Sequence, residues 1–355
     1  MKNLLLNTCF VALAILLVAK TEACETCAVY SPPELRKLLL GEHNDDAKLN
    51  WFTRYSKLDQ RINGTREEPN MGEEIDSFIN QLSLEYALTP KLKAQISVPY
   101  LHRDFKRLQD GALVSDDESG VGDISVLGKF KICETEKSDR SLIVTLLAGL
   151  KTPTGDSDRL GETDHHEESA GAHGHGAEES AGHGTEEAAG HGSEESAGHG
   201  HSSAGHAESA ISGHDVALGS GSWDVFGGIK AEWASDNWLA DLMAQYYLRT
   251  EGDFDYEFAD DLYVSADVGR ILVQKDEFAM SLRGGILGEF RDADEQNGVK
   301  IDHTKLDSWY AIVTAAAAWQ AFTAEFGVDF ALDQDSGAAT LVPDERFRIS
   351  AGVYF

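Results

Sequence analysis

The residues best suited to chemistry are histidines, and most of them lie in one segment. Ten of the thirteen histidines fall between His165 and His214, partly within an eight-residue repeat of the form His-Gly-X-Glu-Glu-X-Ala-Gly. Neutral imidazole nitrogens bind zinc, copper or nickel, and neighbouring carboxylates can complete the ligand shell. The pattern predicts multivalent binding of divalent metal ions, with the alternative that the segment is only a hydrophilic surface tail. The candidate ligands are His165, His166, His173, His175, His183, His191, His199, His201, His206 and His214.

The composition around these histidines predicts a disordered loop over residues 157–216. Glycine, alanine, serine and glutamate dominate this stretch. Without apolar anchors it cannot bury enough surface to offset the entropy of ordering. Because only neutral imidazole binds metal, we expect capture to weaken below about pH 6.5. No permanently bound cofactor is required.

The segments on either side of this loop alternate apolar and polar residues with a period of two. In the last ten residues, RFRISAGVYF, Phe347, Ile349, Val353 and Phe355 share one face. Successive side chains of a strand point to opposite faces, so this is an amphipathic strand. Most segments have about ten residues, the length with which a tilted strand crosses a bilayer. The other predicted strands are residues 49–58, 78–88, 92–102, 124–132, 141–151, 223–233, 237–249, 261–273, 277–290, 308–317 and 320–332.

The terminal strand and its final Phe355 resemble the C-terminal signal of bacterial outer-membrane β-barrels. The resemblance implies a strand that closes the barrel and is read by the barrel assembly machinery. The predicted connections alternate between long and short, as in barrels whose long loops lie outside the cell. The fold class is therefore all-β, a transmembrane antiparallel up-and-down barrel of about twelve strands. A soluble β-sandwich is the rival, but it seldom has so many charged residues at matched depth on the second face.

Aromatic residues near the predicted strand ends fit an interfacial belt. They are Trp51, Trp223, Trp233, Trp238, Trp309, Tyr310 and Trp319.

The amino terminus has the features of a signal peptide, with Lys2, an apolar run from Leu4 to Val18 and small residues before a cut at Ala23. The predicted organisation is a signal peptide at 1–23, a periplasmic segment at 24–46 and a barrel at 47–355. A short periplasmic helix begins near Ser31. Export and the barrel pattern together predict the bacterial outer membrane. Lipidation of Cys24 and a disulfide among Cys24, Cys27 and Cys133 both remain open.

Charged residues occupy the face of the strands opposite the apolar one. Ionised groups cannot be buried unpaired without a severe penalty, so they pair across the lumen or face water. The lumen is thus either a water-accessible pore or a closed core of salt bridges, and the mixed signs predict no simple ion selectivity. The predicted pore-lining residues are Glu85, Lys129, Lys131, Asp224, Lys230, Glu232, Asp241, Arg283, Glu289, Glu325, Asp329, Arg346 and Arg348.

Three glycine-containing motifs are similar to segments of a family of outer-membrane transporters associated with the meta-pathway of phenol degradation. They are Gly120–Ile124, Lys151–Asp156 and Leu218–Asp224, and the phrase Tyr86–Leu92 before Val98–Tyr100 adds to the likeness. The resemblance covers about residues 45–355 outside the insertion. It implies a barrel that passes small, aromatic or hydrophobic molecules. The glycines themselves are explained by strand corners that need positive φ.

These patterns predict an outer-membrane channel for small solutes with a metal-binding external loop. The alternatives are a channel for small hydrophobic or aromatic compounds with an incidental loop, and a non-conducting surface barrel. A membrane hydrolase is disfavoured, because His102 is the only histidine on a predicted strand and the spacing suggests no serine–histidine–acid site; we expect no enzyme activity. The expected partners are outer-membrane lipid, the assembly machinery and divalent ions. The net charge of −31 argues against nucleic acid.

Overall fold

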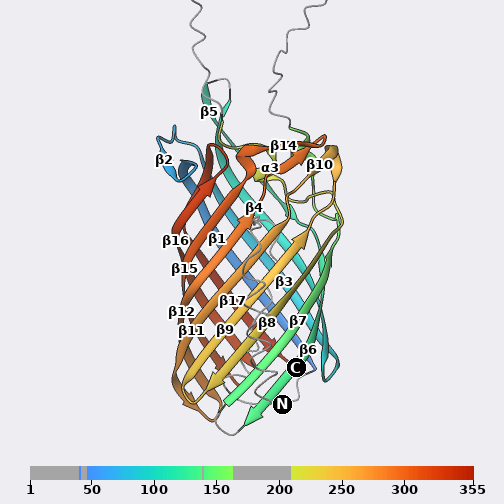
Figure 1. The fold of residues 1–355 in the computed structure, drawn as a ribbon, viewed down its shortest axis with the longest axis vertical. Helices are drawn as coiled ribbons and strands as arrows, with labels where there is room; N and C mark the ends of the chain where they lie inside the picture. Colours follow the sequence, from blue (N-terminus) through green and yellow to red (C-terminus); the bar gives the residue numbers. More distant parts are fainter. Residues whose placement is uncertain (1–39, 41–45, 110, 138–139, 163–208) are drawn as a thin grey trace, which may run out of the picture.

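The chain forms a closed antiparallel β-barrel, shown by a computed structural model that describes residue 40 and residues 46–109, 111–137, 140–162 and 209–355 (Figure 1). Twelve strands follow one another around the wall, as the sequence predicts. They are β1 (Ala47–Asn63), β3 (Glu74–Thr89), β4 (Leu92–Gln109), β6 (Ser125–Lys137), β7 (Arg140–Lys151), β8 (Asp224–Ser235), β9 (Trp238–Leu248), β11 (Asp261–Lys275), β12 (Phe278–Arg291), β15 (Leu306–Trp319), β16 (Phe322–Ser336) and β17 (Thr340–Tyr354).

The barrel closes where β17 pairs with β1. The ladder runs from Lys48 opposite Tyr354 to Ile62 opposite Thr340. At its end, Ala47 and Phe355 exchange both backbone hydrogen bonds, each 3.0 Å long. A terminal strand with an apolar face thus closes the sheet. Closure satisfies backbone groups that hydrocarbon cannot solvate.

The two faces of each strand differ sharply in exposure. On β3, Leu82, Leu84 and Tyr86 are 51%, 44% and 53% exposed, whereas the intervening Ser83 and Glu85 are 2% and 5% exposed. The outer surface is therefore apolar and the inner surface polar, which is the pattern of a barrel with lipid outside. This fold belongs in the bacterial outer membrane. Among the described residues, no helix has the length and apolar character needed to cross a membrane.

One residue of the predicted aromatic belt, Tyr310, does not face the membrane. Tyr310 points into the barrel and is 1% exposed. The guanidinium carbon of Arg346 lies 3.8 Å from its ring centroid. Neighbouring residues of a strand face opposite sides, so Trp309 and Tyr310 cannot both face lipid.

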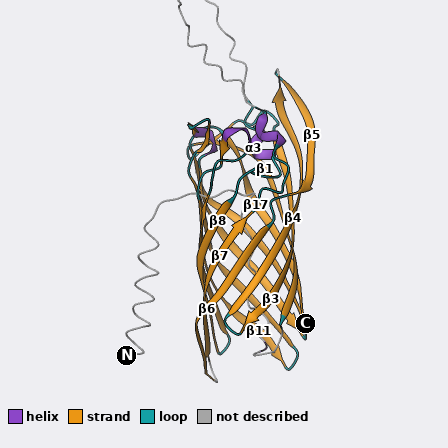
Figure 2. Ribbon diagram, turned by 90° about the vertical axis from the view of Figure 1, so that its right-hand side faces the viewer, coloured by secondary structure: helices purple, strands orange, loops and turns teal. Residues whose placement is uncertain are grey.

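Most strands are longer than predicted, with 18 residues in β4, whereas β9, with 11 residues, is shorter than the predicted segment 237–249. Segments predicted as polar loops are instead strand. Residues 103–109 continue β4, β5 (Ala112–Val121) pairs with that extension, and residues 340–345 belong to β17. Figure 2 shows β5 standing beyond the barrel wall. The hydrogen-bond ladder continues beyond the hydrocarbon, where no apolar face is needed. The predicted strands therefore end where the sequence becomes polar, although the observed strands continue.

The end of the barrel opposite the carboxy terminus carries short helices and strands (Figure 2). They are β2 (Arg66–Glu68), η1 (Asp158–Gly161), α3 (Gly213–Val216), η2 (Asp253–Asp255), β10 (Tyr256–Glu257), β13 (Asp294–Gln296), β14 (Val299–Ile301) and η3 (Asp302–Thr304). We call residues 156–161, 209–222 and 252–260 the external cap. Its apolar contacts include Leu160, Ala217, Tyr256 and Phe258.

The predicted disordered loop is described only at its ends. Residues 157–161 and 209–216 belong to the external cap, because Leu160, Ile211 and Val216 supply the apolar anchors that the rest of the segment lacks. Residues 163–208 lie outside the described residues.

The predicted signal peptide, with Cys24 and Cys27, also lies outside the described residues. The predicted periplasmic helix does too, apart from Leu40. Leu40 packs inside the barrel against a cluster that includes Leu239, Ile271 and Ala316. Cys133 is a free, exposed cysteine on β6.

We expect Leu82→Arg to destabilise the barrel by about 2–4 kcal/mol, because it places a charge on the lipid face. Denaturant unfolding in phosphatidylcholine vesicles measures this. The control is Leu113→Arg on the water-exposed β5, expected to stay within about 0.5 kcal/mol of wild type. Equal effects of the two changes would contradict the assignment of the membrane-spanning part.

Candidate functional site

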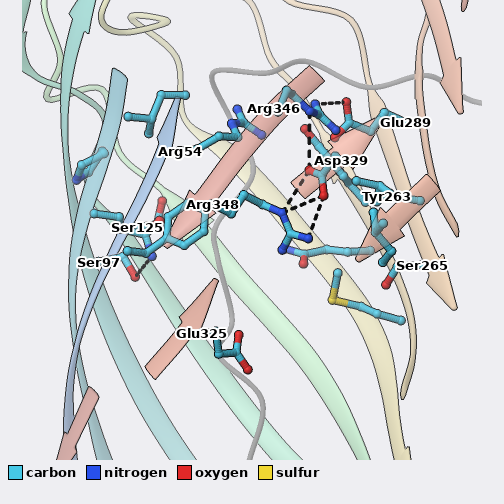
Figure 3. Close-up of a pocket in the computed structure, with 18 of the residues that line it drawn as sticks. Arg54, Ser97, Ser125, Tyr263, Ser265, Glu289, Glu325, Asp329, Arg346 and Arg348 are labelled. Carbon is cyan, nitrogen blue, oxygen red and sulfur yellow. Dashed lines mark hydrogen bonds and ion pairs between the residues drawn. The ribbon is translucent and has the colours of Figure 1, made fainter. Parts of the chain in front are cut away.

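A cavity of about 190 Å³ lies inside the barrel, and each of the twelve barrel strands contributes to its lining. Several of these side chains converge on it in Figure 3. The lining holds equal numbers of basic and acidic residues. The basic residues are Arg54, Lys151, Lys230, Arg283, Arg346 and Arg348, and the acidic residues are Asp123, Asp241, Asp267, Glu289, Glu325 and Asp329.

On one side of the cavity, arginines of β17 bind carboxylates of β16 and β12. Arg348 donates to both oxygens of Asp329, with Nε–O distances of 2.9 and 3.0 Å. Arg346 donates to Glu289 at 2.7 Å and is completely buried. Paired, charge-assisted bonds of this kind are strong, and removing one partner leaves an uncompensated buried charge. The side chains are therefore held in fixed positions.

On the opposite wall of the barrel, three carboxylates stand next to one another in register, and two of them, Asp241 and Asp267, line the cavity. Glu232 of β8 faces Asp241 of β9, which in turn faces Asp267 of β11. Like charges directly opposite each other destabilise a sheet, so they need neighbouring cations. Lys230 lies 3.2 Å from Glu232 and 3.7 Å from Asp241. Arg283 lies 3.3 Å from Asp267.

The structure places eight of the thirteen predicted pore-lining residues on the cavity: Lys230, Asp241, Arg283, Glu289, Glu325, Asp329, Arg346 and Arg348. The other five lie elsewhere. Glu85 and Lys129 form a buried 2.7 Å ion pair on β3 and β6, and Lys131 pairs with Glu134 at 2.6 Å. Glu232 contacts Lys230, and Asp224 belongs to the network described next.

The three glycine-containing motifs meet at the external end of the lumen. Asp123 accepts hydrogen bonds from the backbone of Gly155 at 2.9 Å and of Ser220 at 2.9 Å. Lys151 lies 3.0 Å from Asp123 and 2.6 Å from Asp224. We call Asp123, Lys151, Ser220 and Asp224 the rim network. It ties the cap to three separate strand ends.

The sequence interpretation missed part of this site. Arg54, Asp123 and Lys151 line the cavity but were not among the predicted residues, although the last two stand inside the motifs. The explanation of the glycines was also incomplete. Of the motif glycines, only Gly221 has positive φ, at +66°. Gly219 instead allows close backbone approach, because a Cβ there would lie 2.6 Å from the carbonyl oxygen of Gly155.

Of the ten candidate metal ligands, only His214 lies among the described residues. It is buried in the cap, where its Nδ1 contacts the Ser212 hydroxyl and its Nε2 lies 3.1 Å from Asp215. Both ring nitrogens thus have protein partners. The described residues contain no group of three or more histidine, cysteine, aspartate or glutamate side chains arranged to hold a metal ion.

The same contacts bring a serine, a histidine and an aspartate together, which the sequence spacing did not suggest. Ser212 is the N-cap of α3, His214 and Asp215 belong to the helix, and the backbone N–H of Ser212 donates to the Asp215 carboxylate at 2.9 Å. Ser212 itself is 8% exposed. A carboxylate that binds the serine backbone as well as the imidazole stabilises a helix end, so the geometry explains a structural role.

The protonation of His214 depends on opposing effects. Burial alone lowers its pKa, but the adjacent Asp215 carboxylate raises it above the usual value overall. Burial would raise the pKa of Asp215, yet His214 holds it below the usual range. Tyr256 stacks on His214, and burial with Asp294 raises the pKa of Tyr256 well above 10. The ring of His303 lies 5.6 Å away.

Comparisons with known proteins support the fold alone. No family model and no curated protein matches the chain. An outer-membrane channel from Pseudomonas putida F1 superposes with a TM-score of 0.56 at 14% identity, over 92% of this chain and 100% of that one. The β-domain of the Bordetella autotransporter BrkA superposes with a TM-score of 0.42 at 9% identity, over 88% of this chain and 100% of that one. The CymD monoaromatic hydrocarbon channel superposes with a TM-score of 0.38 at 7% identity, over 95% of this chain and 98% of that one. The last two scores are too low to carry an argument.

We expect the cap to be better ordered at pH 6 than at pH 9. A raised histidine pKa stabilises the folded state below the unfolded pKa of about 6.5, and that stability is lost as pH rises through the folded pKa. Hydrogen exchange of residues 211–218, corrected for intrinsic rates, should be several-fold slower at pH 6.

In His214→Gln this pH difference should vanish, whereas His102→Gln, on the outer face, should keep it. A pH difference that survives in His214→Gln would assign the effect to another group.

Proposed function

We propose that the protein is a channel for small solutes across the outer membrane, with an external histidine-rich segment that binds divalent metal ions at its mouth. The observation that carries the proposal is the charged cavity inside the barrel, lined from all twelve strands. Its volume of about 190 Å³ has room for about six waters. Twelve strands lie between small barrels filled by side chains and wide sixteen-stranded porins.

The character of the lining supports a hydrated pathway. Twelve ionisable side chains reach the cavity, together with the hydroxyls of Ser97, Ser125 and Ser265. Ionised groups in a dry interior would need complete pairing. A lumen that serves only as a core could be apolar and tightly packed instead. Charges around open space are better explained by a route for water and polar solutes.

The external cap lies across this route. Leu218 and Phe258 of the cap line the cavity directly. Arg103 of β4 holds the cap by donating to the carbonyl oxygen of Ala217, and Arg159 of η1 donates to Glu118 of β5 at 2.6 Å. Solute passage therefore requires these latches to open, which makes the cap the gate of the proposed channel.

The ends of the histidine-rich segment are fixed at this gate. Glu162 pairs with Arg107 at 2.8 Å, and the Ser209 hydroxyl donates to Glu73 at 2.6 Å. The nine candidate ligands from His165 to His206 lie between these two anchors in the sequence. Metal ions bound by them would be held at the external mouth. A metal-independent channel for hydrophobic compounds and a non-conducting barrel are the competing functions.

We expect the purified protein to conduct ions in planar bilayers, with longer open times in Arg103→Gln because that change removes a latch of the cap. Single-channel recording measures both. The control is Lys106→Gln on the same strand, whose side chain faces outward and pairs with Glu74; it should resemble wild type. If neither wild type nor Arg103→Gln conducts at any voltage, the channel function is wrong.

We expect Zn²⁺ or Ni²⁺ binding at pH 7.5 to disappear when residues 165–206 are deleted. His214→Gln should leave the stoichiometry unchanged, because His214 is buried with its own partners. Isothermal titration calorimetry gives the stoichiometry, which should fall as pH drops below about 6.5. Undiminished binding after the deletion would exclude the segment as the metal site. Metal uptake with and without it separates a metal channel from one with an incidental loop.

A further inference from the structure

The charges that line the cavity are distributed unevenly around it. The neighbouring strands β17, β1, β3 and β4 contribute three cationic residues and no anionic one: Arg54, Arg346 and Arg348. The remaining eight strands, together with Asp123 just before β6, contribute six acids and three bases. The cavity therefore has a cationic wall and a wall with an excess of negative charge, which the overall count of lining charges conceals.

The cationic wall also carries apolar side chains. One register row crosses four strands, with Arg348 opposite Arg54, Arg54 opposite Ile79, and Ile79 opposite Leu101. Phe52 lies two residues before Arg54 on the same inward face and also lines the cavity. Neighbouring strands are about 4.8 Å apart. The backbones of Arg54 and Arg348 thus lie roughly 5–15 Å from those of Ile79 and Leu101 in the same row.

We infer that this wall is a binding site for a small monocarboxylate with an apolar body. The inference deepens the proposed channel function and rests on it. The carboxylate would be held by Arg54 and Arg348, and the apolar part would lie over Ile79, Leu101 and Phe52. A planar guanidinium binds a carboxylate with two parallel hydrogen bonds, which a neutral or cationic solute cannot accept.

The rest of the cavity explains why the site would select and still release such a solute. Asp329 already accepts bonds from Arg348, so it fixes the position of that guanidinium and moderates its charge. Asp241 and Asp267 on the far wall disfavour a second carboxylate on the same molecule. Binding that is favourable but moderate is what conduction requires.

Hexanoate tests the site, with hexanamide as its uncharged isostere and acetate as the acid without an apolar body. Calorimetric titration of the full-length protein in detergent should show hexanoate binding tighter than either compound. Arg54→Gln should weaken hexanoate binding about ten-fold or more, the effect of losing one charge-assisted interaction. Arg54→Lys, which keeps the charge, should restore part of the loss. Ile79→Ser should weaken hexanoate but not acetate.

Lys230→Gln is the matched comparison, since it removes a cation from the opposite wall of the same cavity. It should change hexanoate affinity less than two-fold. Equal weakening by Lys230→Gln and Arg54→Gln, or equal affinity for hexanoate and hexanamide, would overturn the site. Calorimetry does not depend on conductance, so failure of the proposed binding site can be distinguished from failure of the proposed channel function. A conducting barrel without hexanoate binding loses only this inference, whereas a barrel that never conducts loses the channel function.

Discussion

The pairing of β17 with β1 is the interaction on which the rest of the structure depends. A membrane-spanning sheet with free edges would leave backbone N–H and C=O groups unsatisfied in hydrocarbon, where each costs several kcal/mol. The ladder from Lys48 to Ile62 removes both edges at once. Closure then divides every strand into a lipid face and a lumen face. On β3, for example, Leu82 faces the lipid and Ser83 faces the lumen.

Closure also fixes what the lumen can contain. Once the polar face of every strand points inward, ionised side chains from distant parts of the sequence must share a narrow space. They pair mainly with near neighbours around the wall, as Arg348 does with Asp329 and Lys129 with Glu85. The strand that closes the barrel also carries Arg346 and Arg348. The closing strand therefore completes the fold and supplies two of the three arginines on the cationic side of the cavity.

The sequence predicts the barrel well because its signal is periodic and local. Alternation, strand number and the order of long and short connections all follow from residues close together in the chain. Strand ends such as residues 340–345 were missed because the ladder continues where apolar patterning stops. The inward direction of Arg346 follows from alternation as well. Its partner Glu289 does not, since that contact depends on how β12, β16 and β17 are arranged around the wall.

The histidines show a further limit to what amino-acid composition can predict. His214 falls in the same dense tract as nine others, and nothing in the residue count sets it apart. What sets it apart is Ile211 and Val216, two apolar residues that bury this end of the tract in the cap. Burial brings His214 against Asp215, which favours the protonated ring, and a protonated ring is no metal ligand. Residue type alone therefore does not separate a histidine that packs in the cap from one that is free to bind metal, and His214 is of the first kind.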